Sequence, residues 1–512
     1  MAQISWKHKG SGNWTNASYW SSGTVPGASD DAFIGINGVT VTSNHNTTVD
    51  SIGTNTYSTL SITGKSWFTA TNGTGSSVSL GTIKINGDST MQIGAGTFYN
   101  GGTILLGSSG GYNTFLVDKV VQLEGGGTIE MAAHTTSIGG NWIQGQVSTQ
   151  SQLMQLDNVD NVIAGTGTIT GMYFDNQANG IVETNSNLGA GVLTLLENGI
   201  AGQGIANEGH IFADDGGTLR LVGDPGTPGF FNAGTIYMES TGDMTTLEIG
   251  GDVILKGGGQ LTMSSFPDNY IVSNGQAATF ENVDNVITGS GNIYDQNLTF
   301  VNDAQGQLIL NVANGDFQIY TGNNTVANAG LIEAGASNAL IDIFSPINNS
   351  GTIAANNGGV LSATANVSGS GKAEIFSGSQ MWLMGTSNQV AATFENNAGD
   401  NGLLELAHSL AAGGSRAFSG TIAGLAFDGT HSDTLDLQDI NFAGGVNWSF
   451  QESTNGNRGT LTVSDSMGDT AKLTLLGQYL AAGASANSGN SNLFGLAADH
   501  TSGTLVTTTY HG

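Results

Sequence analysis

The chain of 512 residues contains no cysteine, only five prolines and only 11 Lys and Arg residues. Without cysteine there is no disulfide and no thiolate metal site. Eleven basic residues spread over the whole chain cannot form the positive stripe that neutralises phosphate groups, so nucleic-acid binding is excluded. Long hydrophobic runs are also missing, and no stretch approaches the roughly 18 apolar residues of a transmembrane helix.

Charged residues are scarce, at 10%, and this argues against a helical protein, because amphipathic helices need charged outer faces. Glycine is abundant instead, with 80 residues, and 38% of the chain is hydrophobic. Disordered glycine-rich chains carry more proline and fewer apolar residues. The glycines are therefore expected to separate short strands, and the composition predicts an all-β protein.

The charge balance and the chain start bear on localisation. The formal net charge is −29, which suits an extracellular setting where divalent cations screen carboxylates. The first residues, MAQISWKHKG, lack the apolar core of a signal peptide. We therefore expect a secreted or cell-surface protein that is exported by another route or after removal of a leader.

A short motif, Asn-x-Gly-x-Ile, recurs along the chain. The intervals from Asn207 to Asn232 and from Asn328 to Asn349 are roughly 20 to 25 residues, the length of one coil of a β-solenoid. Each copy runs into a β-branched segment with alternating apolar and polar residues, and one such segment cannot bury its apolar face alone. We predict a right-handed parallel β-helix in which equivalent Asn side chains stack as an amide ladder. The copies are Asn100–Ile104, Asn207–Ile211, Asn232–Ile236, Asn328–Ile332 and Asn349–Ile353.

A longer duplication lies on top of the coil repeat. Phe98–Met131 aligns without gaps to Phe230–Met263, so that Asn100 corresponds to Asn232. Residues 98–185 are repeated at 230–311, and a partial third copy covers 347–405. An array of β-sandwich domains is the alternative, but it predicts a period of about 100 residues with hairpin signals. The finer period favours the solenoid.

The two ends of the chain differ from the repeats. Three of the seven tryptophans, Trp6, Trp14 and Trp20, lie within residues 1–35. A solenoid has to cover its open end, so we predict that residues 1–35 form a cap. The parallel β-helix is expected over residues 36–400, and a distinct β-rich region over residues 401–512.

Both ends also resemble known families. The opening, together with the repeats, resembles bacterial autotransporter-passenger-like and haemagglutinin-like surface β-helix proteins; its residues are Gly12-Asn13-Trp14, Tyr19-Trp20, Gly23, Pro26 and Asp30-Asp31. The C-terminal region resembles the tails of alphaproteobacterial type I secreted proteins; its segments are Gly420–Gly424, Asp433–Leu437, Gly459–Asp465, Leu475–Tyr479 and Gly503–Val506. This resemblance implies a secretion signal in residues 401–512 and a type I exporter as a partner in transit. The calcium nonapeptide GGxGxDxUx of many such proteins is absent.

Three carboxylates are candidate metal ligands. Asp433, Asp436 and Asp439 lie close together near an expected turn, and calcium prefers carboxylate and carbonyl oxygens. A solvated loop is the alternative for the same residues. Calcium is the one cofactor that the sequence suggests.

The most enzyme-like cluster is Asp214-Asp215 with His210 and Arg220. Two carboxylates are what a glycoside hydrolase needs. Adjacent residues on a strand point to opposite faces, however, so such a pair works only at a bend. We therefore nominate no catalytic residue and predict that the protein is not an enzyme.

The composition, the repeats and the resemblance together predict a structural protein of the cell surface or extracellular matrix. We expect a homo-oligomer or homopolymer that assembles into filaments or a surface layer. An adhesin that binds surface glycans is the first alternative, and a polysaccharide-active β-helix enzyme is the second. Exposed aromatic platforms along one face are expected of the adhesin.

Overall fold

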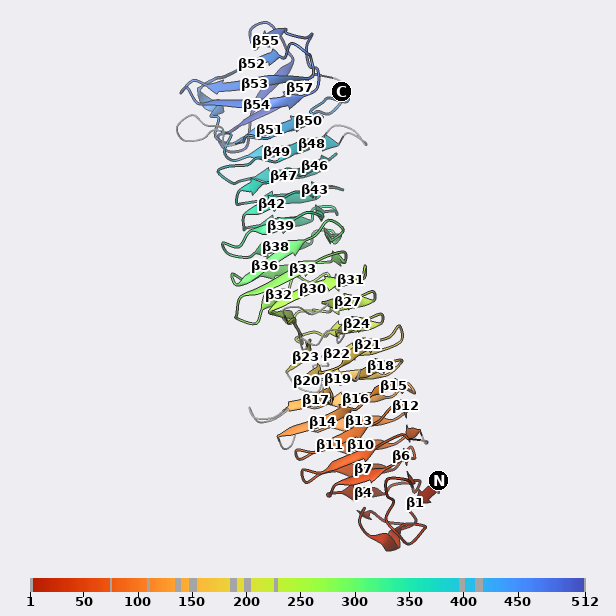
Figure 1. Cartoon of the computed structure of the whole chain (residues 1–512). Coiled ribbons are helices and arrows are strands. Elements are labelled where there is room, and N and C mark those ends of the chain that lie inside the picture. The colour runs from red at the N-terminus through yellow and green to blue at the C-terminus, as the bar shows by residue number, and fades with distance from the viewer. Residues whose placement is uncertain are drawn as a thin grey trace. The chain divides into compact units, whose positions relative to one another are not determined.

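The computed structural model describes residues 3–73, 76–107, 111–133, 140–146, 154–184, 191–197, 204–224, 229–395, 401–409 and 418–510. The chain divides into two compact units, Met1–Thr262 and Met263–Gly512. In the described residues the elements are strands apart from two short 3-10 turns, η1 (Ala17–Tyr19) and η3 (Phe442–Gly444) (Figure 1). The predicted all-β, parallel β-solenoid fold is confirmed.

Unit 1 consists of coils whose strands go in turn to three parallel sheets (Figure 1). Sheet 1 contains β1 (Gln3–Ser5), β3 (Asp31–Ile34), β6 (Ser51–Thr54), β9 (Ser77–Ser79), β12 (Gly96–Asn100), β15 (Val120–Glu124), β18 (Gln155–Asn158), β21 (Tyr173–Asn176), β24 (Ile205–Asn207), β27 (Phe230–Asn232) and β30 (Asp252–Lys256). Sheet 2 contains β2 (Gly12–Asn13), β4 (Thr40–Ser43), β7 (Thr59–Ile62), β10 (Thr82–Ile85), β13 (Thr103–Leu106), β16 (Thr128–Met131), β19 (Val162–Gly165), β22 (Ile181–Glu183), β25 (His210–Ala213) and β28 (Thr235–Met238). Sheet 3 contains β5 (Thr47–Val49), β8 (Trp67–Ala70), β11 (Thr90–Ile93), β14 (Tyr112–Val117), β17 (Gly140–Gly145), β20 (Gly167–Thr170), β23 (Val192–Leu196), β26 (Thr218–Val222) and β29 (Thr245–Gly250). The strand β31 (Gln260–Met263) lies at the division between the units.

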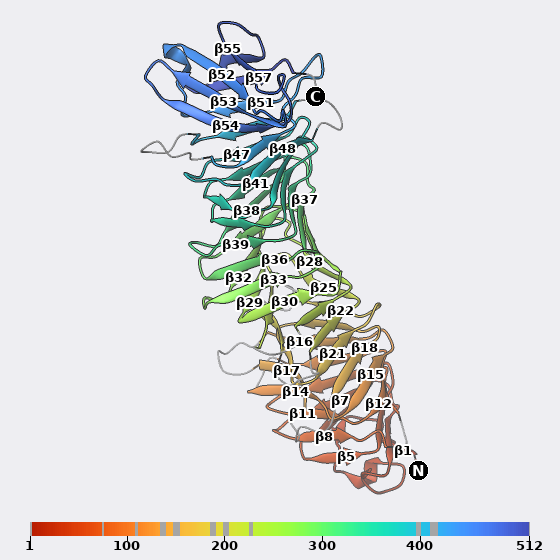
Figure 2. The same ribbon diagram turned by 45° about the horizontal axis from the view of Figure 1, so that its top comes forward.

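Unit 2 repeats the same three-sheet arrangement and adds a C-terminal antiparallel part (Figure 2). Its sheet 1 contains β33 (Ala278–Asn282), β36 (Leu298–Asn302), β39 (Val326–Asn328), β42 (Ile347–Asn349) and β45 (Val367–Ser368). Its sheet 2 contains β34 (Val286–Thr288), β37 (Gln307–Leu310), β40 (Leu331–Ala334), β43 (Thr352–Ala355), β46 (Lys372–Phe376), β48 (Ala391–Glu395) and β50 (Thr421–Ala423). Its sheet 3 contains β32 (Asn269–Ser273), β35 (Gly291–Tyr294), β38 (Asp316–Tyr320), β41 (Leu340–Ile343), β44 (Val360–Ala363), β47 (Gln380–Leu383), β49 (Leu403–Leu406) and β51 (Thr434–Leu437). The C-terminal strands are β52 (Val446–Glu452), β53 (Arg458–Asp465), β54 (Thr470–Leu476), β55 (Ser485–Asn487), β56 (Phe494–Ala498) and β57 (Thr504–Thr508).

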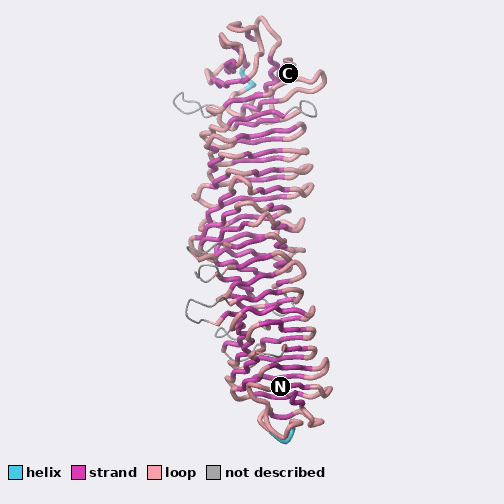
Figure 3. The backbone as a smooth tube through the Cα atoms, turned by 45° about the vertical axis from the view of Figure 1, so that its right-hand side comes forward, coloured by secondary structure: helices cyan, strands magenta, loops and turns pink. Residues whose placement is uncertain are grey.

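The core of each unit is formed by alternate residues of every strand. The typical burial pattern is that of β40, in which Ile332 is buried and its neighbours Leu331 and Glu333 are half-exposed. Equivalent inward residues of successive coils pair in register, as in Ile332 with Ile353. The inward side chains therefore stack into continuous apolar columns, while the outward residues line the faces. Strands of successive coils lie side by side in Figure 3.

The motif Asn-x-Gly-x-Ile has a physical explanation at each of its positions. The Ile is a core residue, and both Ile236 and Ile353 are at most 2% exposed. The Gly lies against the preceding coil: a Cβ atom on Gly234 would be 2.2 Å from the carbonyl oxygen of Gly209. No side chain fits there, because contacts shorter than about 3 Å do not occur between such atoms.

Buried asparagines form the predicted amide ladder inside the solenoid, and four of the five motif asparagines belong to it, whereas Asn100 donates to Asn161 instead. In unit 2 the side-chain amides of Asn282, Asn302 and Asn328 each donate to the side-chain oxygen of the ladder Asn in the next coil, at 2.8–3.0 Å. The ladder residues are at most 1% exposed in unit 2. Buried amides need hydrogen-bond partners, and the next coil supplies them. The ladder consists of Asn158, Asn176, Asn207 and Asn232 in unit 1 and of Asn282, Asn302, Asn328 and Asn349 in unit 2.

The duplication of the sequence is visible in the strand boundaries. The strands β13, β15 and β16 begin at Thr103, Val120 and Thr128. In the second copy, β28, β30 and β31 begin at Thr235, Asp252 and Gln260, which are the residues aligned with those three. Parts of the repeated blocks, among them residues 134–139, 147–153 and 396–400, lie outside the described residues.

Tryptophans cover the core at the N-terminal end of unit 1. Trp6, Trp14 and Trp20 are at most 2% exposed. The ring centroid of Trp14 lies 4.6 Å from that of Trp20 and 5.1 Å from that of the core residue Phe68, and both contacts are edge to face. These rings close the apolar end that would otherwise face water.

The same segment also covers a strand edge. Residues 19–21 run antiparallel to residues 5–7, and the N–H of Ser21 donates to the carbonyl of Ser5 at 2.8 Å. The strand β1 therefore has partners on both sides, with β3 on the other edge. Covering an edge in this way prevents strand pairing with another molecule.

Antiparallel strands close the C-terminal end of unit 2 (Figure 2). The strand β54 pairs with β50 in parallel and with β53 in antiparallel fashion, and β57 pairs antiparallel to β51. This part has its own aromatic core, in which Tyr479 lies against Phe450 and Phe494 and donates its hydroxyl to the carbonyl of Leu425 at 3.0 Å.

The ladder can be tested with adjacent asparagines on β42. Asn349 is fully buried, accepts from Asn328 at 2.8 Å and donates to the carbonyl of Lys372 at 2.9 Å, whereas Asn348 is exposed. We expect Asn349→Ala to lower the free energy of unfolding by about 1–3 kcal/mol, because the buried partners lose hydrogen bonds. Asn348→Ala serves as the control and is expected to change it by less than about 0.5 kcal/mol. Urea unfolding of the full chain measures both, and equal effects would contradict the role of the ladder.

Candidate functional site

Outward residues of successive coils form columns on each face. Because the coils pair in register, equivalent outward side chains lie one strand spacing apart, about 4.8 Å. A column of chemically similar side chains is therefore a repeated surface that a long ligand can follow. The inward residues are occupied by the core, so binding groups have to come from these columns.

An exposed aromatic column lies on sheet 3 of unit 2. Tyr294 pairs in register with Tyr320, and their ring centroids are 4.8 Å apart. Phe344 continues the column in the next coil, since its N–H donates to the carbonyl of Ile319, the neighbour of Tyr320. Tyr294 is 45% exposed and Phe344 is 40% exposed. We call Tyr294, Tyr320 and Phe344 the aromatic column.

Polar side chains lie beside this column. Gln318 and Asp342 pair in register, and Gln318 donates its side-chain amide to Asp316 at 3.1 Å. Burial raises the pKa of Asp342, a hydrogen bond with Ser362 lowers it in part, and the charge of Asp316 raises it further. Flat apolar rings next to carboxylate and amide groups are the combination that sugars require, since sugars have apolar ring faces and hydroxyl edges.

A second aromatic group lies on sheet 2 of unit 1. Phe212 and Tyr237 pair in register and stack with an interplanar angle of 9° and a centroid distance of 4.8 Å. His210 lies 5.8 Å from the ring of Tyr237. This histidine therefore belongs to an outer aromatic surface.

The structure separates the enzyme-like cluster of the sequence. Arg220 is on sheet 3, where its guanidinium pairs with Glu248 at 2.9 Å. Asp215 lies in a turn, and hydrogen bonds from the hydroxyl and N–H of Thr241 hold its pKa below the usual value. Asp215, His210 and Arg220 thus make different local contacts.

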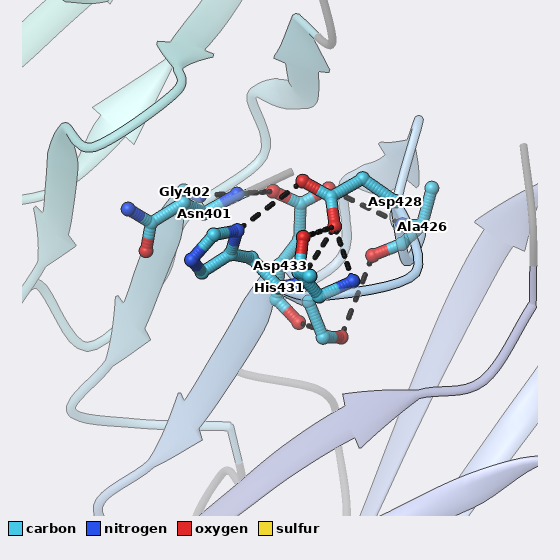
Figure 4. A network of polar contacts seen from close by, with 8 residues as sticks. Asn401, Gly402, Ala426, Asp428, His431 and Asp433 are labelled. Atoms are coloured by element: carbon cyan, nitrogen blue, oxygen red, sulfur yellow. Dashed lines mark hydrogen bonds and ion pairs between the residues drawn. The ribbon is translucent and has the colours of Figure 1, made fainter. Parts of the chain in front are cut away.

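The structure does not bring the three calcium candidates together on one ion site. Asp433 is 1% exposed and accepts from the N–H groups of Asn401, Gly402 and Ala426 at 2.9–3.2 Å (Figure 4). Asp433 directly precedes β51, whereas Asp436 lies within β51.

The third candidate, Asp439, has its own partner and accepts from the hydroxyl of Ser409. In the described ranges no group of three or more His, Cys, Asp or Glu side chains is placed to hold a metal ion. Calcium at Asp433, Asp436 and Asp439 stays a prediction.

Asp436 instead belongs to a carboxylate cluster with Glu405 and Asp499. Asp436 is only 7% exposed and pairs in register with Glu405. Its Oδ2 accepts from the side-chain amide of Gln438 at 2.9 Å, whereas its Oδ1 has no hydrogen-bond partner in the part of the chain that the structure describes. Burial, followed by the charge of Asp499, raises the pKa of Asp436 to about 6. Burial and both neighbouring carboxylates raise the pKa of Glu405 as well.

The aromatic column is not evident in the sequence because coil lengths differ. Tyr294 and Tyr320 are separated by a longer stretch of chain than Tyr320 and Phe344, so no fixed period links the three rings. A signal was present nonetheless: each of these rings directly follows a core isoleucine, in the pairs Ile293-Tyr294, Ile319-Tyr320 and Ile343-Phe344.

The fold defines the class of the protein as a parallel β-solenoid with closing segments at both chain ends. Comparison with protein-family models gives no match, and comparison with curated proteins also gives none. Within the described residues, no helix has the length and apolar character needed to cross a membrane.

The carboxylate cluster predicts a pH dependence. A carboxyl group whose pKa is raised by folding stabilises the folded protein when it is protonated. Its contribution to the free energy of unfolding is therefore fully present below the unfolded pKa of 3.8 and is lost as the pH rises through about 6. We expect Asp436→Asn to remove this loss and to stabilise the protein at pH 7 by about 1–2 kcal/mol, allowing for the solvent near Glu405 and Asp499. Thermal unfolding from pH 4 to pH 7 measures the difference.

The matched control is Asp428→Asn. The exposed carboxylate of Asp428 accepts from the N–H of His431 and from the hydroxyl and N–H of Thr430, and these hydrogen bonds hold its pKa well below the usual range (Figure 4). This variant is expected to keep the wild-type dependence of the melting temperature on pH between pH 4 and pH 6. If the melting temperature of Asp436→Asn also depends on pH as that of the wild type does, the carboxylate cluster does not titrate between pH 4 and pH 6.

Proposed function

We propose that the protein is a secreted structural component of a cell surface or extracellular matrix. The observation that carries this proposal is the self-sufficient solenoid: main-chain pairing and buried Asn ladders hold each coil to the next, and no disulfide is needed. Such a scaffold suits an exposed, long-lived structural element. The localisation and the type I export route rest on the composition and on the C-terminal resemblance.

The covered edges bear on how such subunits would assemble. Residues 19–21 cover β1, and antiparallel strands follow β50 and β51. End-to-end growth by strand pairing is therefore disfavoured. Assembly into a layer or bundles would use the outer faces of the sheets, and the net charge of −29 opposes such lateral contacts until cations screen it.

Electron microscopy of the purified chain tests this proposal. We expect lateral arrays or bundles whose amount increases when calcium or salt is added, because screening reduces the repulsion between acidic subunits. Dispersed particles under every condition would contradict self-assembly. Fibres that grow end to end would contradict the protective role of the covered edges.

A second candidate function, adhesion to glycans, is favoured by the aromatic column. Exposed aromatic platforms are what an adhesin was expected to show. The exposed rings of Tyr294 and Phe344, with the half-exposed ring of Tyr320 between them, supply one beside Gln318 and Asp342. Sugars bind such rings through their apolar faces while carboxylate and amide groups accept or donate hydrogen bonds.

We expect Tyr320→Ala to weaken binding of a neutral oligosaccharide by about tenfold, corresponding to ~1.4 kcal/mol, because it interrupts the column at its centre. Tyr57→Ala is the control, since Tyr57 is 70% exposed and no ring contact of Tyr57 is found in the described residues. Isothermal titration calorimetry with a series of neutral hexasaccharides measures both. Equal affinities of the two variants would exclude the column as the binding surface.

A further inference from the structure

A groove on sheet 1 of unit 1 has the features of a ligand site. It is a cavity of about 500 Å³ above β6, between the flanking strands β3 and β9. The outward residues of β6 are Ser51 and Gly53, which are small. Their neighbours in register are larger: Phe33 pairs with Gly53 on one side, and Val78 pairs with it on the other. The groove therefore follows β6 with apolar walls on both sides.

The ring of Phe33 occupies space that two missing side chains leave free. A Cβ atom on Gly53 would be 2.8 Å from Cδ2 of Phe33, and one on Gly35 would be 2.4 Å from Cε1. The ring therefore leans over the sheet above both glycines and forms part of the groove lining. The opposite wall is exposed as well, with Val78 at 38% and Leu80 at 40%.

Polar groups lie at one end of the groove. The hydroxyl of Ser51 donates to Oδ1 of Asp31 at 2.6 Å, and both residues line the cavity. An aromatic wall with a carboxylate and a hydroxyl at its end can hold an apolar ring face and hydrogen-bond the hydroxyls of the same ligand. Cavities of this size are typical of small-ligand sites.

We propose that this groove binds a short segment of a neutral oligosaccharide, with a sugar ring against Phe33 and its hydroxyls at Asp31 and Ser51. An extended peptide is disfavoured, because β6 is paired with β3 on one edge and with β9 on the other and has no free edge for an added strand. An anionic polysaccharide is disfavoured by Asp31 and by the net charge of −29. The inference extends the adhesive function proposed above to unit 1, but the groove and the aromatic column lie in different units and are tested separately.

Two variants probe the groove and one serves as a control. Gly53→Val fills the space above β6 and displaces the ring of Phe33, and Gly53 lies in a strand where valine is favoured. Phe33→Ala removes the ring itself. Tyr99→Ala is the matched control: Tyr99 pairs in register with Val78, is 41% exposed and does not line the cavity.

The experiment is calorimetric titration of the full chain with cellohexaose, mannohexaose and hexagalacturonate. We expect at least one neutral hexasaccharide to bind, Gly53→Val and Phe33→Ala to weaken that binding by about tenfold or more, and Tyr99→Ala to bind as the wild type does. Circular dichroism and melting curves establish that each variant is folded, and Phe33→Ala keeps the test valid if Gly53→Val does not fold.

The outcomes distinguish this inference from the adhesive function of unit 2. If Tyr320→Ala abolishes a site and the groove variants do not, the groove is not a glycan site although the aromatic column is. If the groove variants abolish a site and Tyr320→Ala does not, the groove is supported and the aromatic column is not. Absence of binding to every neutral hexasaccharide, or tighter binding of hexagalacturonate, overturns the inference.

Discussion

The register between coils is the constraint on which the rest of this structure depends. Main-chain pairing alone tolerates a slip along the strand, but a buried amide does not, because it has to meet the amide of the next coil. Asn302 illustrates this: it accepts from Asn282 and donates to Asn328, and all three are essentially inaccessible to water. A slip of a single position would turn these amides toward the faces and bring outward polar residues into the core. The ladder therefore fixes the register in which the residues of successive coils pair.

Fixed register also organises the outer faces. Insertions between strands alter the loops and leave the columns intact, so side chains that are distant in sequence are brought to the spacing of neighbouring strands. The aromatic column, the stacked pair Phe212–Tyr237 and the groove over β6 all arise in this way. A solenoid is thus suited to holding many weak contacts in a line, which is what binding along an extended polymer requires.

The coil architecture could be predicted from the sequence, whereas the carboxylate cluster and the groove on the outer surface could not. The motif Asn-x-Gly-x-Ile combines a buried amide, a glycine in close contact with the backbone of the preceding coil, and a core residue. Each of these roles requires a particular residue type, so all three are recognisable in the local sequence. The carboxylate cluster leaves no such mark, because Asp499 reaches Glu405 and Asp436 only through the antiparallel pairing of β57 with β51. The groove depends on the direction of one ring, that of Phe33, over Gly53 in β6 and over Gly35, which directly follows β3. The spacing of Asp433 and Asp436 suggested a shared ion, but Asp433 accepts from the N–H of Gly402, whereas Asp436 accepts from the side-chain amide of Gln438.

The third residue of the motif has a consequence for how such a chain lengthens. At Gly234 and at Gly351 the backbone of the preceding coil leaves no room for a side chain, so both coils make the same close backbone contact with the coil before them. A block of whole coils therefore fits wherever another block ends, as the matching boundaries of β13 and β28 in the two copies illustrate. Duplication of a whole number of coils therefore reproduces contacts that the chain already makes, so a longer chain needs no new kind of interface between coils.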